Sequence, residues 1–533
     1  MSAQAPSTKG PRTKILCVRP RPNPASNAVL TGAVDEWVHS LSLHADVEQI
    51  EQDFDWLEVY ERVRPDFLLF DSVHWGRRHR LNIAHIDAHP EVPRALLLNS
   101  DPHDPMRPLM MDMLSTYRID TLFCTGIEDV QQMPELRRLN CFVLPKFIDA
   151  DVFREYDEPK SIPLTIMSAH LFPTFYPWRA KVTEEVQKII PTLLYTHPGY
   201  NKDAHSPFEI RDESYARMLS RSRFAVADTT TLDYVVRKHL EIPACGTILV
   251  APESEPLRDY GFVDLENCIL GSGEELYAKI LAVAGQPDHY ERIRQAGHAL
   301  VHGRYTRKNW THILDWYACR RSLKPGEMVQ QQGVFGGFRA VAAGAHVASI
   351  ANFTVQDNPM GVALRAARQV LLHGGNVNAV VAQLTVTMKW INHVAEPWFM
   401  MAVIAFVAGD LESAGSWLAR RSAAQGAEDA TLGLLDPVEI AWLMFFAHVI
   451  GDEELYQQMT DRAAGTAHVA IRRMIWLTQG ATPVTNLADA GLDRPRADDC
   501  PSIHWLGDES FDEWAGLVQK ILAANGQAEA LAS

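Results

Sequence analysis

The sequence predicts an α/β protein in which two successive domains with parallel sheets are followed by an all-α region. Up to about residue 325, short β-rich runs alternate with amphipathic helical stretches, and beyond this point the sequence is Ala-rich and helical. The 533 residues are enough for roughly three to four domains of about 150 residues each. With 47% hydrophobic and 22% charged residues, the composition is that of a globular protein and excludes wholesale disorder.

The first domain is expected over residues 13–155, after a flexible N-terminus of residues 1–12. Its expected strands are largely continuous apolar runs, which is typical of strands whose sheet is covered on both faces. These runs are Lys14–Val18, Phe67–Phe70, Arg94–Leu98, Thr121–Cys124 and Cys141–Leu144.

The second domain is expected over residues 156–325 and repeats the same alternation. Its strand candidates are Leu164–Met167, Thr192–Tyr195, Phe224–Ala227, Thr247–Val250 and Cys268–Leu270. The two sets of strands predict two α/β domains of similar size, joined by a Pro- and Asp-containing passage.

The remaining chain is expected to form a Gln/Gly-rich linker (326–352), a helical domain (353–480) and a C-terminal extension with a terminal helix (481–533). In the helical part, Gly375 and Gly409 lie 34 residues apart, each between two helical runs. This spacing is the tetratricopeptide period. Plain antiparallel helix packing is the alternative.

Charge and cysteine usage exclude some classes of function. With 50 Lys+Arg against 66 Asp+Glu, the net charge of −16 argues against non-specific binding of nucleic acid. The seven scattered cysteines show no metal-ligand spacing, so no metal site is expected. No secretory signal is recognised, and the longest apolar runs fall short of the ~20 residues that a membrane span needs. We therefore expect a cytoplasmic protein.

The most informative segment runs from Asp233 to Val250. It predicts a helix that ends at Pro243, a tight turn at Gly246 and then a buried strand. Asp233 and Glu241 are eight residues apart, so both carboxylates are expected on nearly the same face of that helix.

This arrangement suits a nucleotide. A carboxylate such as Glu241, at the carboxyl edge of a parallel sheet, can accept both hydroxyl groups of a ribose. The cations Arg237 and Lys238 and nearby backbone N–H groups can bind a diphosphate. The hydroxyl groups of Thr229 and Thr230, after the preceding strand, are further candidates for the diphosphate. Two alternatives stay open: a solvated charged helix face, and a Thr-rich helix N-cap.

Several stretches occur in a characteristic order. They are Ile166-Met-Ser-Ala-His170, Tyr176-Pro-Trp-Arg179, Tyr215-Ala-Arg-Met-Leu-Ser220, Glu241-Ile-Pro-Ala-Cys-Gly246, Glu255-Pro-Leu-Arg-Asp-Tyr-Gly261, Glu274-Glu-Leu276 and Tyr305-Thr-Arg307 to Trp310. In this order they resemble the C-terminal half of GT-B glycosyltransferases, in particular the CgeB-like branch of the group 1 glycosyltransferases. The resemblance covers about 150 residues well and, more weakly, some 300 residues.

The resemblance implies two facing Rossmann-like domains and a nucleotide-sugar donor, with no metal and no permanently bound cofactor. The family's ribose-binding carboxylate falls on Glu241, and its partner in the E-x7-E pattern falls on Asp233, which is shorter than the usual Glu. Arg179 matches the family's Tyr-Pro-x-Arg position and is the leading phosphate ligand. His170 and Gly246 lie in matching stretches and are further donor-site candidates. The alternative for Arg179 is a helix-surface pairing with Glu184 or Glu185.

The first domain is expected to supply the acceptor side and any base. Asp101 and His103 follow the strand Arg94–Leu98, in the kind of loop where α/β proteins place their chemistry. A carboxylate beside an imidazole suits a general base. The alternative is a loop whose Asp and Asn residues cap the next helix.

The sequence thus predicts a glycosyltransferase that moves a hexose-like sugar from a nucleotide-sugar to a protein or glycan acceptor, metal-independent and leaning towards retention. The helical domain is expected to bind a protein partner or the acceptor. Two alternatives remain: a sugar-nucleotide epimerase on the same two-domain frame, and a noncatalytic scaffold that acts through its helical repeats.

Overall fold

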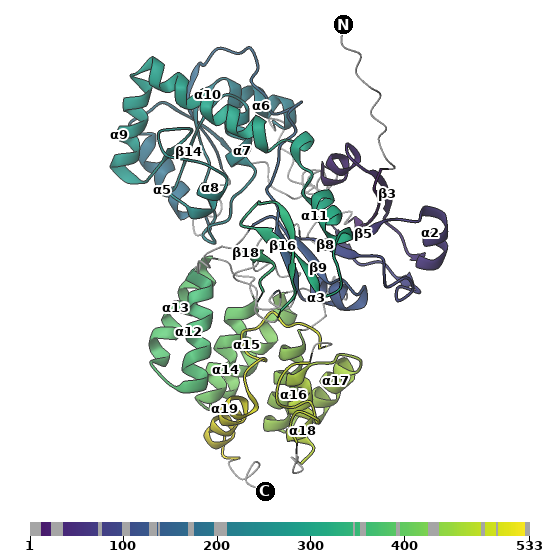
Figure 1. The fold of residues 1–533 in the computed structure, drawn as a ribbon. Coiled ribbons are helices and arrows are strands. Elements are labelled where there is room, and N and C mark those ends of the chain that lie inside the picture. The colour runs from purple at the N-terminus through teal and green to yellow at the C-terminus, as the bar shows by residue number, and fades with distance from the viewer. Residues whose placement is uncertain are drawn as a thin grey trace. The chain divides into compact units, whose positions relative to one another are not determined.

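The computed structural model (Figure 1) describes residues 12–22, 36–72, 77–98, 107–126, 136, 139–168, 175–196, 210–344, 347–351, 359–390, 395–424, 436–480, 486–496 and 499–527. The chain divides into two compact units. Unit 1 comprises Met1–Ser100, Tyr117–Asp129 and Leu139–Thr354, and unit 2 comprises Asp101–Thr116, Val130–Arg138 and Val355–Ser533.

The first sheet of unit 1 has six strands in the order β10-β9-β8-β5-β1-β3, all paired in parallel. These strands are β1 (Lys14–Val18), β3 (Asp46–Ile50), β5 (Phe67–Asp71), β8 (Arg94–Leu97), β9 (Thr121–Cys124) and β10 (Asn140–Val143). The strand order reverses between β1 and β5, because β3 pairs with β1 on the side opposite to β5.

Sequence reasoning missed β3. Its residues Asp-Val-Glu-Gln-Ile are mostly polar, and their exposure shows why: β3 is the edge of the sheet and is largely accessible. This part of the chain also contains shorter elements outside the six-stranded sheet. They are β2 (Arg21–Pro22), β4 (Phe54–Asp55), α2 (Trp56–Val63), β6 (Arg77–His79) and β7 (Ile83–Ala84).

The second sheet has five parallel strands in the order β12-β11-β13-β14-β15. They are β11 (Ile162–Ser168), β12 (Thr192–Thr196), β13 (Ser222–Val226), β14 (Ile248–Ala251) and β15 (Ile269–Leu270). Each of the five strands expected in this region is present. The reversal of strand order lies between β11 and β13.

Both faces of the second sheet are covered by helices. Along β13, Phe224 and Val226 join one buried cluster while Ala225 joins another on the opposite face, which explains the continuous apolar run. The helices of this region are α5 (Pro177–Val186), α6 (Asp212–Ser220), α7 (Lys238–Ala244), α8 (Glu255–Asp259), α9 (Gly273–Ala284) and α10 (Pro287–Arg304). Side chains of α5 and α9 pack in the cluster of Phe224, and side chains of α6 and α7 pack in the other.

The chain then returns to the first sheet. After a short 3-10 turn, η2 (Arg307–Asn309), helix α11 (His312–Arg321) packs Trp316 into the core of the first sheet, edge-on to Phe67 and Phe123. The expected second domain thus contributes its last helix to the core of the first.

The segment expected to be a linker forms a small sheet in the order β17-β16-β18. Its strands are β16 (Glu327–Gln332), β17 (Phe338–Ala342) and β18 (Ile350–Ala351). The buried side chain of Gln331 hydrogen-bonds both the N–H and the carbonyl of Val143 at the end of β10, at 2.9 and 2.8 Å. A Gln-rich composition suggests a linker, but here a glutamine amide replaces the next strand as partner of the sheet.

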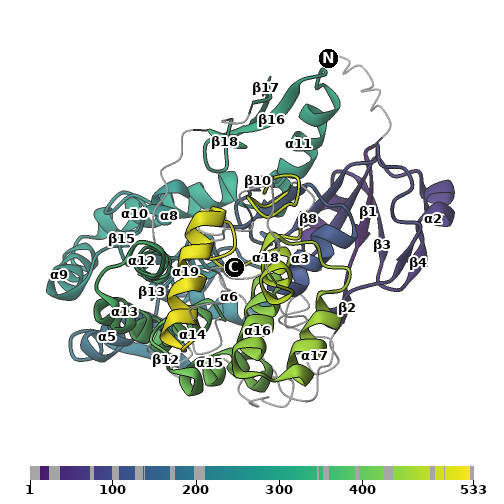
Figure 2. The same cartoon turned by 90° about the horizontal axis from the view of Figure 1, so that it is seen from below.

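Unit 2 is helical, as Figures 1 and 2 show. Its helices are α3 (Arg107–Thr116), α12 (Pro359–His373), α13 (Val377–Trp390), α14 (Ala395–Val407), α15 (Leu411–Ala424), α16 (Pro437–Ile450), α17 (Glu453–Ala463), α18 (Val469–Thr478) and α19 (Phe511–Ala524). The two parallel sheets and the helical C-terminal region confirm the predicted fold class. The expected terminal helix is α19, and Ser510 caps it.

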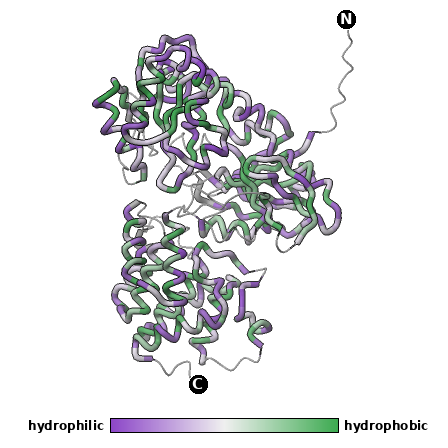
Figure 3. Tube along the Cα trace, turned by 60° about the vertical axis from the view of Figure 1, so that its left-hand side comes forward, coloured by the Kyte–Doolittle hydropathy of each residue, from purple (hydrophilic) through white to green (hydrophobic). Residues whose placement is uncertain are grey.

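The helices of unit 2 form consecutive pairs. Gly451, with φ 73°, ends α16 before α17 begins, and a turn through Gly409 separates α14 from α15. Helix α19 packs along α12 and α14 (Figure 2). Its Lys520 donates to the Leu371 carbonyl at 3.2 Å. The tube in Figure 3 shows hydrophobic and hydrophilic stretches alternating along these helices. The tetratricopeptide-like assignment stays a prediction.

One element of unit 2 comes from far earlier in the chain. Helix α3 connects β8 to β9 of the first sheet in sequence, yet it belongs to unit 2. Its first residue, Arg107, forms a buried ion pair with Glu396 of α14. Within the described residues, no helix is long and apolar enough to cross a bilayer.

Candidate functional site

The carboxyl ends of β11 and β13 form the switch point of the second sheet, where open α/β sheets bind ligands. Asp228 lies two residues after β13, and Arg179 lies in the first turn of α5, the helix that follows β11. The backbone N–H of Arg179 donates to Oδ2 of Asp228 at 3.0 Å, and its guanidinium group stacks over the Tyr176 ring at 3.8 Å. Burial raises the pKa of Asp228, which is 1% exposed, to about 7. A buried carboxyl group that titrates near neutrality therefore lies at this switch point.

The sequence leaves open a surface pairing of Arg179 with Glu184 or Glu185. In the structure, Lys188 pairs with Glu184 at 3.6 Å, and the hydroxyl group of Tyr277 donates to Glu185 at 2.8 Å. Both glutamates therefore have partners of their own, while Arg179 itself is buried.

The segment before α7 is not the helix that the sequence predicts, because α7 begins only at Lys238. The hydroxyl group of Thr230 accepts from the backbone N–H of Tyr234 at 3.4 Å, and the N–H of Asp233 donates to the Thr230 carbonyl at 2.8 Å. Such local side-chain bonds compete with helix formation, and Asp233 adopts a left-handed φ of 58°. The expectation that Asp233 and Glu241 share one helix face is therefore wrong.

Asp233 is nonetheless held at the same edge of the sheet. Burial raises its pKa, while hydrogen bonds with Ser254 and Thr229 oppose that rise. The helix N-cap interpretation of the Thr run is wrong, since the N-cap of α7 is Arg237. Thr229 and Thr230 are instead buried beside Asp233.

Helix α7 continues one residue past its predicted end at Pro243. Glu241 is only 8% exposed, so the interpretation of a solvated charged face is wrong. Lys238 Nζ donates to the Met167 carbonyl in β11 at 3.2 Å. Burial, assisted by the nearby charge of Arg179, lowers the pKa of Lys238 to about 8. Lys238 and Arg179 therefore lie within electrostatic reach of each other at the switch point.

Arg237 lies between two carboxylates. Its Nη1 is 2.8 Å from Oε2 of Glu36, and its Nε is 3.5 Å from Oε1 of Glu241. Burial raises the pKa of Glu241, and the cations Arg237 and Lys238 oppose that rise. The structure thus places Arg237 against carboxylates, where the sequence suggested a phosphate ligand.

Gly246 forms the tight turn between α7 and β14. Its φ is +66°, and a Cβ at this position would lie 2.7 Å from both Arg294 Nη1 and Glu155 Cδ, which form an ion pair. Its carbonyl accepts from Lys160 Nζ. Backbone conformation and packing thus account for this glycine without a ligand.

Three predicted site residues, Asp101, His103 and His170, lie outside the described residues. The described parts of the chain contain no group of His, Cys, Asp and Glu side chains arranged to hold a metal ion.

Sequence reasoning missed a polar cluster near the site. Lys146 Nζ lies 4.0 Å above the Tyr234 ring and donates to Thr125 at 3.0 Å, and the two hydroxyl groups of Thr125 and Tyr234 are 2.6 Å apart. Burial, together with the charges of Lys146, Lys238 and Arg179, lowers the pKa of the fully buried His239 to about 4. Lys146 follows the carboxyl end of β10, a position at which a search along strand ends finds it.

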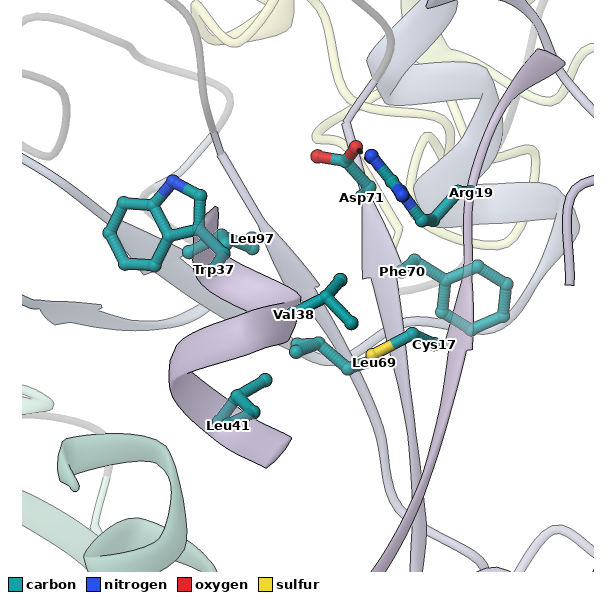
Figure 4. Close-up of a pocket in the computed structure, with 9 residues that line it drawn as sticks. All are labelled: Cys17, Arg19, Trp37, Val38, Leu41, Leu69, Phe70, Asp71 and Leu97. Carbon is teal, nitrogen blue, oxygen red and sulfur yellow. Dashed lines mark ion pairs between the residues drawn. The ribbon is translucent and has the colours of Figure 1, made fainter. Parts of the chain in front are cut away.

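The switch point of the first sheet carries a cavity of about 20 Å³, room for about one water molecule (Figure 4). Most of its lining is apolar, and Arg19 and Asp71 lie side by side at one edge, 3.9 Å apart. Arg19 also contacts Glu51 at 3.1 Å and Gln49 at 2.9 Å. Burial raises the pKa of the Cys17 thiol in this lining to about 12, so this cysteine is no nucleophile at neutral pH.

Comparison with known proteins bears on the second sheet. Residues 179–315 match the family model described as glycosyl transferase-like. The matched range includes Arg179, Asp228, Lys238 and Glu241. A search of curated protein sequences found no match to the chain.

Solved structures with a similar fold include sucrose-phosphate synthase from Thermosynechococcus elongatus, at 11% identity and a TM-score of 0.39, over 55% of this chain and 95% of that one. A glycosyltransferase from Rickettsia africae aligns at 10% identity and a TM-score of 0.36, over 59% and 100% of the two chains. HepE from Anabaena, in complex with UDP and glucose, aligns at 11% identity and a TM-score of 0.35, over 58% and 100%.

Proposed function

We propose that this protein is a glycosyltransferase that transfers a sugar from a nucleotide-sugar donor to a protein or glycan acceptor. The observation that carries the proposal is the set of buried and half-buried charged side chains at the switch point of the second sheet, inside the range that matches the glycosyl transferase-like model. It joins cations, Arg179 and Lys238, with carboxyl groups, Asp228 and Glu241.

Different parts of the bound donor would contact different members of this set, according to the charge of each part. Glu241, the carboxylate that the family resemblance marks, would accept hydrogen bonds from the ribose hydroxyl groups. Arg179 and Lys238 would bind the diphosphate, because charge-assisted hydrogen bonds from cations are strong. Asp233, at the same sheet edge, would contact the donor sugar.

In the transfer, the bond between the anomeric carbon and the diphosphate oxygen breaks and a bond from the anomeric carbon to the acceptor forms. The departing nucleoside diphosphate carries the electron pair of the broken bond, and Arg179 and Lys238 would stabilise its charge. The acceptor must lose a proton, and Asp101 with His103 are the proposed base. We propose that the reaction needs no metal ion and that it retains the configuration at the anomeric carbon.

For unit 2 we propose a role in recruiting the acceptor or a protein partner. Consecutive helix pairs of the kind seen from α12 to α17 are the building units of helical-repeat binding surfaces.

The test is a donor panel of UDP-, GDP-, ADP-, CMP- and dTDP-sugars, measured by thermal shift and by release of the nucleotide, which is CMP for the CMP-sugars and a nucleoside diphosphate for the others. A ligand that binds only the folded state raises the unfolding temperature, and the rise grows with the ratio of ligand concentration to Kd. Glu241→Gln should weaken binding of the active donor about 10- to 100-fold, because a hydrogen bond to a charged group is worth about 1.5–3 kcal/mol.

Glu266→Gln, at an exposed position of the same α/β region, is the matched control and should bind normally. Unchanged binding by Glu241→Gln would remove this residue from the site. Absence of any binding across the panel would favour the scaffold alternative, and isomerised donor without transfer would favour the epimerase.

A further inference from the structure

Arg237 is shared unequally between two carboxylates. Its Nη1 lies 2.8 Å from Oε2 of Glu36, a full ion pair, whereas its Nε lies 3.5 Å from Oε1 of Glu241. The Nε atom is buried and has no hydrogen-bond partner. A buried N–H without a partner costs free energy, so a small shift of the Glu241 carboxylate toward Arg237 would be favourable.

Glu36 comes from a different part of unit 1 than Arg237. It lies in the helical stretch that precedes β3 of the first sheet, whereas Arg237 caps α7 of the second sheet. The other oxygen of Glu36 is 4.0 Å from Arg307, and Arg307 pairs with Asp149 at 2.7 Å. Among the described residues, Arg237 is thus the cation nearest to Glu36, and it links the first-sheet segment to the carboxylate of α7.

Glu241 has acceptor capacity to spare. Among the described residues, its carboxylate makes one ionic contact, the 3.5 Å approach to Arg237, and no shorter polar contact. A carboxylate offers about four lone-pair positions, so two ribose hydroxyl groups can bind while Arg237 stays in place.

We infer that Arg237 is a positioning residue that holds Glu241 for the ribose of the donor, and that Glu36 tunes this hold by competing for the same guanidinium group. The inference rests on the proposed function, because it assumes that Glu241 binds a nucleotide ribose. It reassigns Arg237 from phosphate binding and ties the donor site to the segment that carries Glu36.

The charges around Glu241 set the sign of the expected effect. The Glu241 side chain faces charged or titratable groups from four segments. These groups are Arg237 and Lys238 at the start of α7, Asp212 and Tyr215 of α6, Cys245 in the turn after α7, and Glu36 in the first-sheet segment. Arg237 and Lys238 favour the charged carboxylate, while Glu36 and Asp212 disfavour it. Removing Arg237 therefore raises the pKa of Glu241, and removing the charge of Glu36 lowers it.

The experiment measures Kd for UDP-glucose, or for the panel sugar nucleotide that binds best, from pH 4.5 to 8 in the full-length protein. The diphosphate of a sugar nucleotide does not titrate in this range, so the acid loss of binding reports on the protein. Arg237→Gln should weaken binding at pH 7.5 and move the acid midpoint up by about one pH unit. Glu36→Gln should move the midpoint down, and Arg237→Lys should restore it in part.

Arg237→Gln and Glu36→Gln should shift the acid midpoint in opposite directions, although they remove the two partners of one ion pair. A loss of folding would instead weaken donor binding in both variants. Arg320→Gln is the matched control, because Arg320 is similarly exposed and pairs with Asp120 at 3.6 Å. A 2′,3′-dideoxy form of the same sugar nucleotide should show no midpoint shift in any variant.

Normal donor binding with an unmoved midpoint in Arg237→Gln and Glu36→Gln would overturn the inference and leave the proposed function standing. If no sugar nucleotide binds the wild-type protein, the proposed function fails, and this inference fails with it.

Discussion

The backbone N–H of Arg179 donates to the carboxylate of Asp228 across 3.0 Å, and this bond ties the first turn of α5 to the end of β13. Since α5 follows β11 in the chain, the bond links the segments that follow the two strands between which the order of the second sheet reverses. The cation proposed for the diphosphate is thereby held beside a carboxyl group whose pKa burial has raised to about 7.

Asp228→Asn should change how stability depends on pH. The pKa of Asp228 is raised from 3.8 to about 7 in the folded protein, so the folded state binds more protons between these values. Stability from this group is fully present below about pH 4 and is lost as pH rises to about 7. An asparagine can still accept the Arg179 N–H but does not titrate.

As pH rises from 4.5 to 7.5, wild type should lose stability that Asp228→Asn keeps. The difference in free energy of unfolding between the two proteins should change by at least the roughly 1.4 kcal/mol that one pKa unit represents. Urea unfolding at the two pH values measures the difference, with the exposed Asp157→Asn as control. Parallel pH profiles for wild type and Asp228→Asn would show that Asp228 is charged throughout.

Gly246→Ala should destabilise unit 1 by about 2 kcal/mol or more, from a left-handed φ together with a close contact. The added Cβ would lie 2.7 Å from the ion pair of Arg294 and Glu155. Gly326→Ala is the matched control, because Gly326 has φ +84° but nothing within 4 Å of an added Cβ, so it should cost only about 1 kcal/mol. Equal losses for the two variants in urea unfolding would contradict the contact.

Arg107→Met should destabilise unit 2 by about 3–5 kcal/mol, because it leaves the carboxylate of Glu396 buried without its cation. The double variant Arg107→Met with Glu396→Met should recover much of that loss, since both buried charges are then gone. Thermal unfolding of the single and double variants forms the test. Additive losses would mean that the two side chains act independently.

Much of the α/β fold was predictable because its strands are continuous apolar runs, which signal burial on both sheet faces without any knowledge of contacts. Edge strand β3 was not predictable in this way, since its residues are polar and mostly accessible. The same limit applies to Gln331, whose buried amide pairs with β10 from 188 residues away.

At the candidate site, the residue types were predictable and their arrangement was not. Glu241 and Lys238 were named from their pattern and Arg179 from the family resemblance, and each is buried or partly buried in the region of the switch point. The shared helix face of Asp233 and Glu241 was wrong, because hydrogen bonds around Thr230 close a turn where periodicity suggested a helix.

The alternation of strands and helices, the helical C-terminal region and the turn at Gly246 could all be predicted from the amino-acid sequence, since they depend on local periodicity and backbone conformation. The pairing of Arg237 with Glu36, and the burial that raises the pKa of Asp228 to about 7, became visible only in the folded chain. Both depend on charges and burial contributed by segments distant in the chain, and Coulombic and desolvation energies follow distance in space, which no local pattern encodes.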